Sequence, residues 1–300
     1  MQTSKLPENV NYKNLSYETC WKAIIRPYRD LYDKIDLGEK EFTFHKQKIK
    51  REDYQILSYR GFLIKCSFYR SDIFNRDPFI RPVVIYLHGN SSSRLEGKKM
   101  LKYVLDKNMD FFIFDFPGCG QSEGHYISLG YHEQKDIKKI IDFIEKLPGV
   151  GNIGLWGRSM GAATTLLYSY KDKRIKCICL DSPFSDFKIL SKELCQKEIN
   201  IPGIIIDSIF YFVKKTIQNK NKTNLEELKP YNCCQLSTCN ALFIHAMKDE
   251  LIPLEHTIKL YESYAGKKTI NIVEGGHNTI RQNHILNKIC NFFYNNLKDE

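Results

Sequence analysis

Short apolar runs recur along the chain and alternate with segments whose apolar residues follow helical spacing. The runs span residues 83–87, 111–114, 153–156, 177–180, 241–245 and 270–273 and predict strands, and the run at 83–87 is continuous, as in a parallel strand buried on both faces of a sheet. Upstream of them, residues 53–57 and 62–69 predict a hairpin around Arg60 and Gly61. Because strands that alternate with helices build parallel sheets, the pattern predicts an α/β fold with a mostly parallel sheet.

Helical spacing is clearest at residues 137–147, where apolar residues share one helical face and stop before Pro148. Similar patterns predict helices at 17–32, 101–105, 162–167 and 285–293. The first of these lies within a polar leader, residues 1–47. We therefore expect a polar, helical leader followed by an α/β domain over residues 48–300.

The segment at about 185–239 interrupts this alternation, because it is much longer than one crossover between neighbouring strands. It has a helical pattern and contains an apolar run at 204–213 that ends at Lys214 and Lys215. Two interpretations stay open: the segment forms either an extra pair of packed helices or a lid inserted over a functional site.

Composition is that of a globular protein, since 42% of the 300 residues are hydrophobic. The ten cysteines do not suggest a disulfide framework, because several lie in apolar runs, where cysteine behaves as a small hydrophobic residue. The chain opens with a polar segment rather than a signal peptide, so we expect a reducing, cytoplasmic location. Cys233, Cys234 and Cys239 lack a nearby histidine or CxxC spacing, and we predict no metal site there.

The net charge is +10, but the lysines are scattered and form no long basic run. We interpret them as a solvated surface and predict no nucleic-acid partner. No apolar stretch reaches the length of a membrane span.

The sequence GRSMG at residues 157–161 fits the G-x-S-x-G nucleophile elbow. It follows a predicted strand and precedes a predicted helix, which is the strand–turn–helix context that this motif requires. Small residues let the strand and helix backbones approach closely, so that the turn presents the Ser159 hydroxyl clear of the sheet. The motif and its context predict that Ser159 is a catalytic nucleophile.

A serine nucleophile needs a base within hydrogen-bond reach, and the base needs an orienting carboxylate. Asp249 and His277 each follow a predicted strand, in the chain order serine, acid, histidine expected for this fold. Asp181 ends another strand and is the rival acid; its alternative role is to cap backbone N–H groups at residues 181–184. We predict that Asp249 orients His277.

The oxyanion of an acyl-transfer intermediate needs fixed hydrogen-bond donors. We expect them to be the backbone N–H groups of Met160 and of Asn90, which lies in the loop after the strand at 83–87, with Gly89 allowing a sharp turn. His88 more plausibly braces this loop than acts as a base. Cys119 lies in a glycine-rich turn that suits neither a nucleophile nor a phosphate cradle.

Several motifs together resemble those of the α/β-hydrolase family over residues 48–300. They are YLHGN at 86–90, DFPGCGQSEG at 115–124, GRSMG at 157–161, DSPF at 181–184, HAMKD at 245–249 and GHN at 276–278. The form of the motifs is similar to the ABHD-like, or serine aminopeptidase-like, branch, which includes esterases, lipases and protein depalmitoylases. The resemblance implies a mostly parallel, eight-stranded sheet flanked by helices and a triad on Ser159, Asp249 and His277.

These observations predict a serine hydrolase that cleaves carboxylic esters or thioesters of a small-molecule or acylated substrate and needs no cofactor. One alternative is a serine aminopeptidase-like peptide hydrolase. Another is an α/β-hydrolase scaffold that binds without catalysis. The peptide hydrolase would need an acidic group near the site to hold the substrate amine. The non-catalytic scaffold would usually lack a member of the triad.

The apolar run at 204–213 suggests where an acyl chain would bind. Its only polar side chains are those of Asp207, Ser208 and Tyr211. We hypothesise that Ile206 and Phe210 line a pocket for the chain, and that the run, flanked by lysines, touches a membrane surface transiently.

Overall fold

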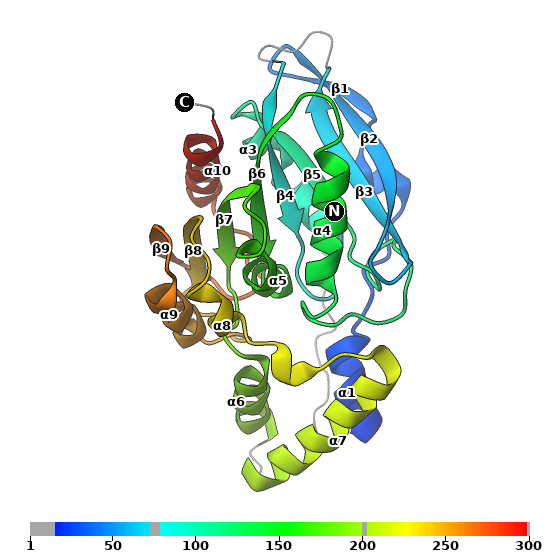
Figure 1. Ribbon diagram of the computed structural model, residues 1–300, viewed down its shortest axis with the longest axis vertical. Coiled ribbons are helices and arrows are strands. Elements are labelled where there is room, and N and C mark those ends of the chain that lie inside the picture. The colour runs from blue at the N-terminus through cyan, green and yellow to red at the C-terminus, as the bar shows by residue number, and fades with distance from the viewer. Residues whose placement is uncertain (1–15, 73–78, 200–202, 299–300) are drawn as a thin grey trace.

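The computed structural model describes residues 16–72, 79–199 and 203–298 (Figure 1). Its centre is one nine-stranded sheet with the strand order β1-β2-β3-β5-β4-β6-β7-β8-β9. The strands are β1 Glu41–Phe44, β2 Gln47–Leu57, β3 Leu63–Ser71, β4 Arg81–Leu87, β5 Asp110–Phe114, β6 Val150–Arg158, β7 Ile175–Asp181, β8 Asn240–Ala246 and β9 Lys268–Val273. In sheet order, the neighbours among β5, β4, β6, β7, β8 and β9 pair in parallel. The neighbours among β1, β2, β3 and β5 pair antiparallel.

The predicted α/β-hydrolase architecture is therefore confirmed, with one difference. The sheet has nine strands where the resemblance implied eight, because β1 adds an antiparallel strand at one edge. This strand precedes residue 48, at which we predicted the α/β domain to begin, so part of the leader belongs to the sheet. The division into leader and domain stays a prediction.

Helices cover both faces of the sheet (Figure 1). They are α1 Tyr17–Ile25, α2 Arg94–Lys98, α3 Leu101–Leu105, α4 Glu133–Ile144, α5 Met160–Ser169, α6 Phe187–Ile199, α7 Gly203–Asn221, α8 Pro230–Cys234, α9 Leu254–Ser263 and α10 Asn283–Leu297. Two short 3₁₀ turns, η2 and η4, span Lys34–Leu37 and Leu225–Glu227. Helix α1 ends well before the predicted residue 32, because Pro27 disfavours helical backbone at Arg26.

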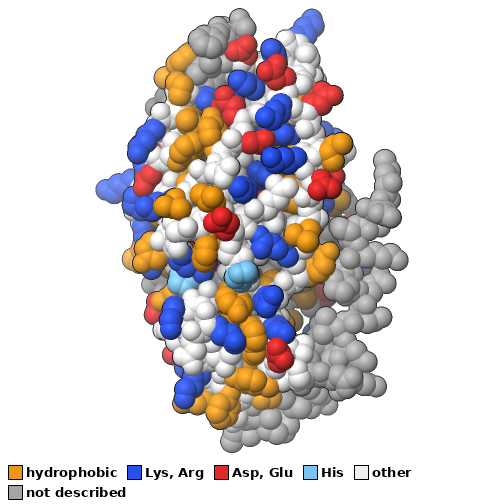
Figure 2. Space-filling view, turned by 90° about the vertical axis from the view of Figure 1, so that its right-hand side faces the viewer, with side chains coloured by type: hydrophobic (Ala, Val, Ile, Leu, Met, Phe, Trp, Pro, Cys, Tyr) orange, Lys and Arg blue, Asp and Glu red, His pale blue; other side chains and the backbone are white. Residues whose placement is uncertain are grey.

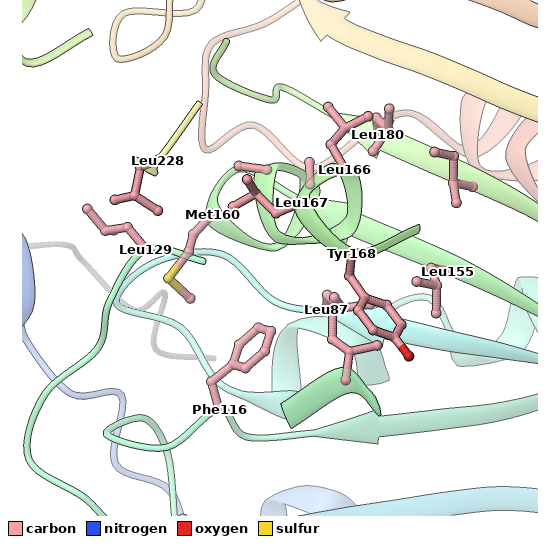
Figure 3. Packing of buried hydrophobic residues seen from close by; sticks show 14 of the residues in the cluster. Leu87, Phe116, Leu129, Leu155, Met160, Leu166, Leu167, Tyr168, Leu180 and Leu228 are labelled. Atoms are coloured by element: carbon pink, nitrogen blue, oxygen red, sulfur yellow. The ribbon is translucent and has the colours of Figure 1, made fainter. Parts of the chain in front are cut away.

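Two buried clusters form the core, one on each face of the sheet. Alternate side chains of β4 divide between them, so that Val83 and Ile85 face one cluster while Val84 and Tyr86 face the other. Met160 lies just after the predicted nucleophile and packs in the first cluster, as Phe116 and Leu129 also do (Figure 3). The elbow therefore packs against buried apolar side chains, which hold its backbone in place.

Helices α1, α6 and α7 lie together at one end of the molecule, and we call them the cap (Figure 1). Helix α6 begins shortly after the carboxyl end of β7, so the cap lies at the edge of the sheet where the parallel strands end. The inner side of α7 is buried at Ile206, Phe210, Val213 and Ile217, one helical face. The 185–239 segment thus contains a packed helix pair, and whether it also opens as a lid stays a prediction.

The surface agrees with the interpretation of the scattered lysines. Basic and acidic side chains are interspersed over the face shown in Figure 2. All ten cysteines are free. Within the described ranges, no helix combines the length and the apolar character needed to cross a membrane.

Candidate active site

Ser159 occupies the turn between β6 and α5 with φ 50° and ψ −116°, a backbone conformation that non-glycine residues rarely adopt. The Ser159 N–H donates to the carbonyl of Asp181 at 2.8 Å, which ties the turn to the neighbouring strand. A Cβ atom at Gly157 would lie 2.4 Å from the Gly161 carbonyl oxygen, and one at Gly161 would lie 2.0 Å from that of Leu87. Both glycines are therefore required by the close approach of strand, turn and helix.

The imidazole of His277 lies between Ser159 and Asp249. Its Nε2 is 3.0 Å from Ser159 Oγ, and its Nδ1 is 2.7 Å from Asp249 Oδ2. The other oxygen of Asp249 accepts the N–H groups of Leu251 and Ile252, which fixes the carboxylate. This geometry fits a neutral imidazole that donates from Nδ1 and accepts the serine proton at Nε2.

Electrostatics keep the Asp249 carboxyl ionised. Burial works to raise its pKa, but the hydrogen bond and the electrostatic interaction with His277 outweigh burial and hold the pKa below its usual range. An ionised Asp249 stabilises the imidazolium that forms when His277 takes up a proton.

The rival acid, Asp181, has a different partner. The Arg281 guanidinium donates to both Asp181 oxygens, from Nη2 at 2.7 Å and from Nε at 3.0 Å and 3.1 Å. Burial would raise the pKa of Asp181, yet the charges of Arg281 and Arg158 hold it below its usual range. The carboxylate thus pairs with an arginine that sequence reasoning did not identify, rather than with His277 or with its own turn.

The predicted oxyanion donors lie on the two loops that flank Ser159. Met160 begins α5, and Asn90 follows β4; within the described ranges neither N–H has an intramolecular acceptor. The left-handed φ of the β4 loop belongs to Ser91, at 58°, rather than to Gly89. Gly89 lies directly beside the elbow, because a Cβ atom there would be 3.7 Å from Ser159 Cβ, an ordinary van der Waals contact.

His88 braces the same loop, as predicted. Its buried ring accepts the Phe116 N–H at Nε2, 3.0 Å away, while Nδ1 lies 2.7 Å from the Gly89 carbonyl. Cys119 is also buried, and burial raises the pKa of its thiol, so the group is poorly suited to attack.

The leader contributes a contact that the sequence pattern did not reveal. The Arg29 guanidinium donates to backbone carbonyls of one turn, those of Cys119, Gly120, Ser122 and Gly124. The turn follows β5, at the edge of the sheet that carries Ser159. The leader therefore takes part in shaping the loops around the site.

The predicted substrate-binding residues lie apart from this cluster, on the cap. Ile206 and Phe210 are 3% and 8% exposed, and both face the protein interior from α7. A hollow of about 320 Å³ adjoins Asp249, between Leu194 and Lys197 of α6 and the loop that carries Met247. The structure thus brings Ser159, Asp249 and His277 together and leaves an open concavity beside the acid. The described residues include no group of three or more potential metal ligands.

Comparisons with known proteins agree with this architecture. Residues 82–195 match the family model described as the alpha/beta hydrolase fold. YqkD of Bacillus subtilis is 28% identical over 222 residues, which cover 72% of each chain. The lysophosphatidylserine lipase ABHD12 of Danio rerio is 26% identical over 63% of this chain, and the match spans only 49% of ABHD12.

Among solved structures, the esterase Pf2001 of Pyrococcus furiosus superposes with a TM-score of 0.67 at 19% identity, covering 90% of this chain and 99% of the esterase. At that identity the superposition supports the fold alone. The family match over residues 82–195 and the superposition show that the chain has the α/β-hydrolase fold, and the relatives support its membership of the α/β-hydrolase superfamily.

Proposed function

We propose that this protein is a serine hydrolase that cleaves carboxylic ester or thioester bonds. The observation that carries the proposal is the position of His277, whose two ring nitrogens contact Ser159 and Asp249. In the same proposal, the N–H groups of Asn90 and Met160 form the oxyanion hole, and no cofactor takes part.

The mechanism follows from these contacts. His277 Nε2 removes the Ser159 proton as Oγ attacks the acyl carbon, and the negative charge moves to the former carbonyl oxygen, which the two N–H groups hold. Collapse expels the alcohol or thiol, protonated by His277, and leaves an acyl-enzyme. Water, deprotonated by the same imidazole, then releases the acid and restores the Ser159 hydroxyl.

The relatives support an ester of an acylated molecule as substrate. Pf2001 is named an esterase and ABHD12 a lysophosphatidylserine lipase. Leu194 of the cap and Asp249 line the same hollow, and we propose that an acyl chain binds against the cap, with Ile206 and Phe210 as candidate contacts. The transient membrane contact and the cytoplasmic location belong to the same proposal.

Labelling with a fluorophosphonate and hydrolysis of p-nitrophenyl esters test the assignment. Ser159→Ala should abolish both, because the fluorophosphonate reacts with an activated serine hydroxyl. Ser263→Ala, at the end of α9, is the matched control and should retain both. Heat-sensitive labelling that persists in Ser159→Ala would refute Ser159 as the nucleophile.

A substrate comparison separates the proposed chemistry from the aminopeptidase-like alternative. Acyl p-nitrophenyl esters, an acyl thioester and aminoacyl amides are compared by kcat/KM. Esters or thioesters should be the better substrates, and a preference for amides with a free amino group would favour the peptide hydrolase instead.

A further inference from the structure

The backbone of His277 is held on both sides by charged side chains. Its N–H donates to Glu250 Oε2 at 3.0 Å, and its carbonyl accepts Arg158 Nη2 at 2.7 Å. The same Nη2 lies 3.3 Å from the carbonyl of Thr279. Because Arg158 immediately precedes Ser159, one guanidinium joins the loop that carries the predicted base to the elbow that carries the predicted nucleophile.

Arg158 has its own carboxylate partner on the far side. Glu96, on α2, places Oε1 3.4 Å from Arg158 Nη1. The other oxygen, Oε2, accepts the N–H of Gly89 at 2.8 Å. Gly89 immediately precedes Asn90, so the Glu96 carboxylate connects Arg158 to the predicted oxyanion loop.

The environment makes these contacts strong. The Arg158 and Glu96 side chains are 8% and 13% exposed, so water screens their interaction weakly. The hydrogen bonds of Glu96 with the Gly89 N–H and of Arg158 with the His277 carbonyl are charge-assisted, and such bonds are stronger than neutral ones. A Cβ atom at Gly89 would lie 3.7 Å from Glu96 Oε2, an ordinary van der Waals distance, so the carboxylate lies directly beside the Gly89 backbone.

We propose that Glu96 and Arg158 are positioning residues that hold the oxyanion loop and the base loop at fixed places around Ser159. The inference rests on the proposed function. Neither side chain contacts the reacting atoms; Glu96 acts through the Gly89 N–H, and Arg158 acts through the His277 carbonyl. Displacing a catalytic group by about 1 Å can cost about 10²-fold in rate, so a lost anchor should appear in the chemical step.

The test uses Glu96→Ala, which removes both contacts, and Glu96→Gln, which keeps an oxygen for Gly89 but loses the charge facing Arg158. Glu145→Gln is the matched control, because Glu145 pairs with Arg174 at 2.8 Å on the surface, with its side chain 56% exposed. For each variant, kcat is expressed per site titrated with fluorophosphonate, so that an inactive or unfolded fraction does not count. KM and the affinity for an alkyl boronic acid, which forms a tetrahedral adduct on serine, are measured beside it.

Glu96→Ala should lose roughly tenfold to 10²-fold in kcat per titrated site, up to the scale of one lost oxyanion donor, with a smaller change in KM. Its affinity for the boronic acid should fall with kcat/KM, because the adduct depends on the same donors as the transition state. Glu96→Gln should lie between Glu96→Ala and the wild type. A purely structural role would lower the unfolding midpoint without changing kcat per titrated site.

Wild-type kcat in both Glu96 variants, equal to that of Glu145→Gln, would overturn the inference. If Glu96→Ala fails to fold, the near-isosteric Glu96→Gln decides the question by the same measurements. Failure of the proposed function is distinguishable, because it would appear as wild-type turnover that survives Ser159→Ala.

Discussion

At the scale of single residues, two buried aspartates near the proposed base have separate partners and should have separate effects. Asp249→Asn should lower kcat by about 10⁴-fold, because an amide does not hold the neutral imidazole of His277 in the reactive tautomer. Asp181→Asn should lower kcat much less but destabilise the fold, because it leaves Arg281, 3% exposed, without its carboxylate. Turnover per titrated site and thermal unfolding of both variants give the comparison.

The reverse pattern would reassign the acid. If Asp181→Asn is folded and inactive while Asp249→Asn approaches wild-type turnover, the orienting carboxylate has been placed on the wrong strand.

Larger side chains at Gly89 test whether the position of the oxyanion loop beside Ser159 matters for turnover. The Cβ of Gly89→Ala has room, since its nearest neighbours lie 3.7 Å away, whereas the branches of valine reach toward Ser159 and Glu96. Gly89→Val should reduce kcat by roughly 10²-fold or more, the scale of one lost oxyanion donor. Gly89→Ala and Asn90→Ala should lose much less, because the proposed donor is a backbone N–H. A large loss in a well-folded Asn90→Ala would show that its side chain takes part.

Asp136 provides a prediction about stability and pH. It is wholly buried at 0% exposure, and burial raises its pKa to about 7 from the ordinary 3.8, although the Tyr59 N–H donates to it. Between about pH 4 and pH 7 the folded protein therefore retains a proton that the unfolded chain releases. The stability that Asp136 contributes is fully present below its unfolded pKa and falls as pH rises through this window, by at most about 1.4 kcal/mol per pH unit.

Urea unfolding at pH 5 and pH 7.5, in wild type and in Asp136→Asn, checks this sign. The wild type should lose more stability than the variant between the two values. An equal loss in both proteins would mean that Asp136 is ionised throughout the range.

At the scale of elements, α7 is the part of the cap on which the acyl-chain proposal depends. Each buried methylene contributes about 0.8 kcal/mol, so kcat/KM should rise about threefold to fourfold per CH₂ until the pocket is full. Replacing Ile206 and Phe210 with serine should flatten this slope from acetyl to decanoyl esters while retaining activity on acetyl esters. The matched control replaces Ile209 and Phe212 with serine, because these side chains of the same helix are 38% and 58% exposed.

Two outcomes would contradict that assignment. A wild type that prefers acetyl esters has no chain pocket of this kind. A double serine variant at 206 and 210 that keeps the full slope would show that these residues serve packing alone.

The sequence predicted strands better than the contacts between them. Apolar runs mark β4 to β8 because both faces of these strands are largely buried, whereas the edge strand β9 is buried only at Val273. Strand β1 alternates exposed and half-buried residues and lies in a polar segment, so it carried no comparable signal. Helix α7 was hard to interpret because apolar residues also stand on its outer side, which hid the buried face at 206, 210, 213 and 217.

The candidate site shows the same limit. Chain order and position after strands were enough to single out Ser159, Asp249 and His277. Periodicity carries no information about which distant side chain an arginine meets, so the partners of Arg29 and Arg158 emerged only from the fold. Arg158 lies inside the GRSMG motif, yet nothing in the motif points to Glu96.

At the scale of the whole molecule, helix α1 of the leader contacts helix α7, although most of the sequence lies between them. The Tyr17 hydroxyl donates to the Phe212 carbonyl at 2.9 Å, and these residues are 195 positions apart. The Lys220 ammonium lies 4.7 Å from the centre of the Trp21 ring. The cap is therefore built from one segment that precedes the sheet and one that lies between β7 and β8, with α1 packed against α7.

The ribosome makes α1 long before it makes the helix that covers it. At about 5–20 residues per second, the chain between Tyr17 and Phe212 takes roughly 10–40 s to synthesise. During that time the side of α1 that will meet α7, including Trp21, has no partner from that helix. Helix α1 thus gains its contacts with α7 only after that later segment has been synthesised, and a nascent chain that stalls before residue 212 exposes the α7-facing side of α1 to chaperones and proteases alike.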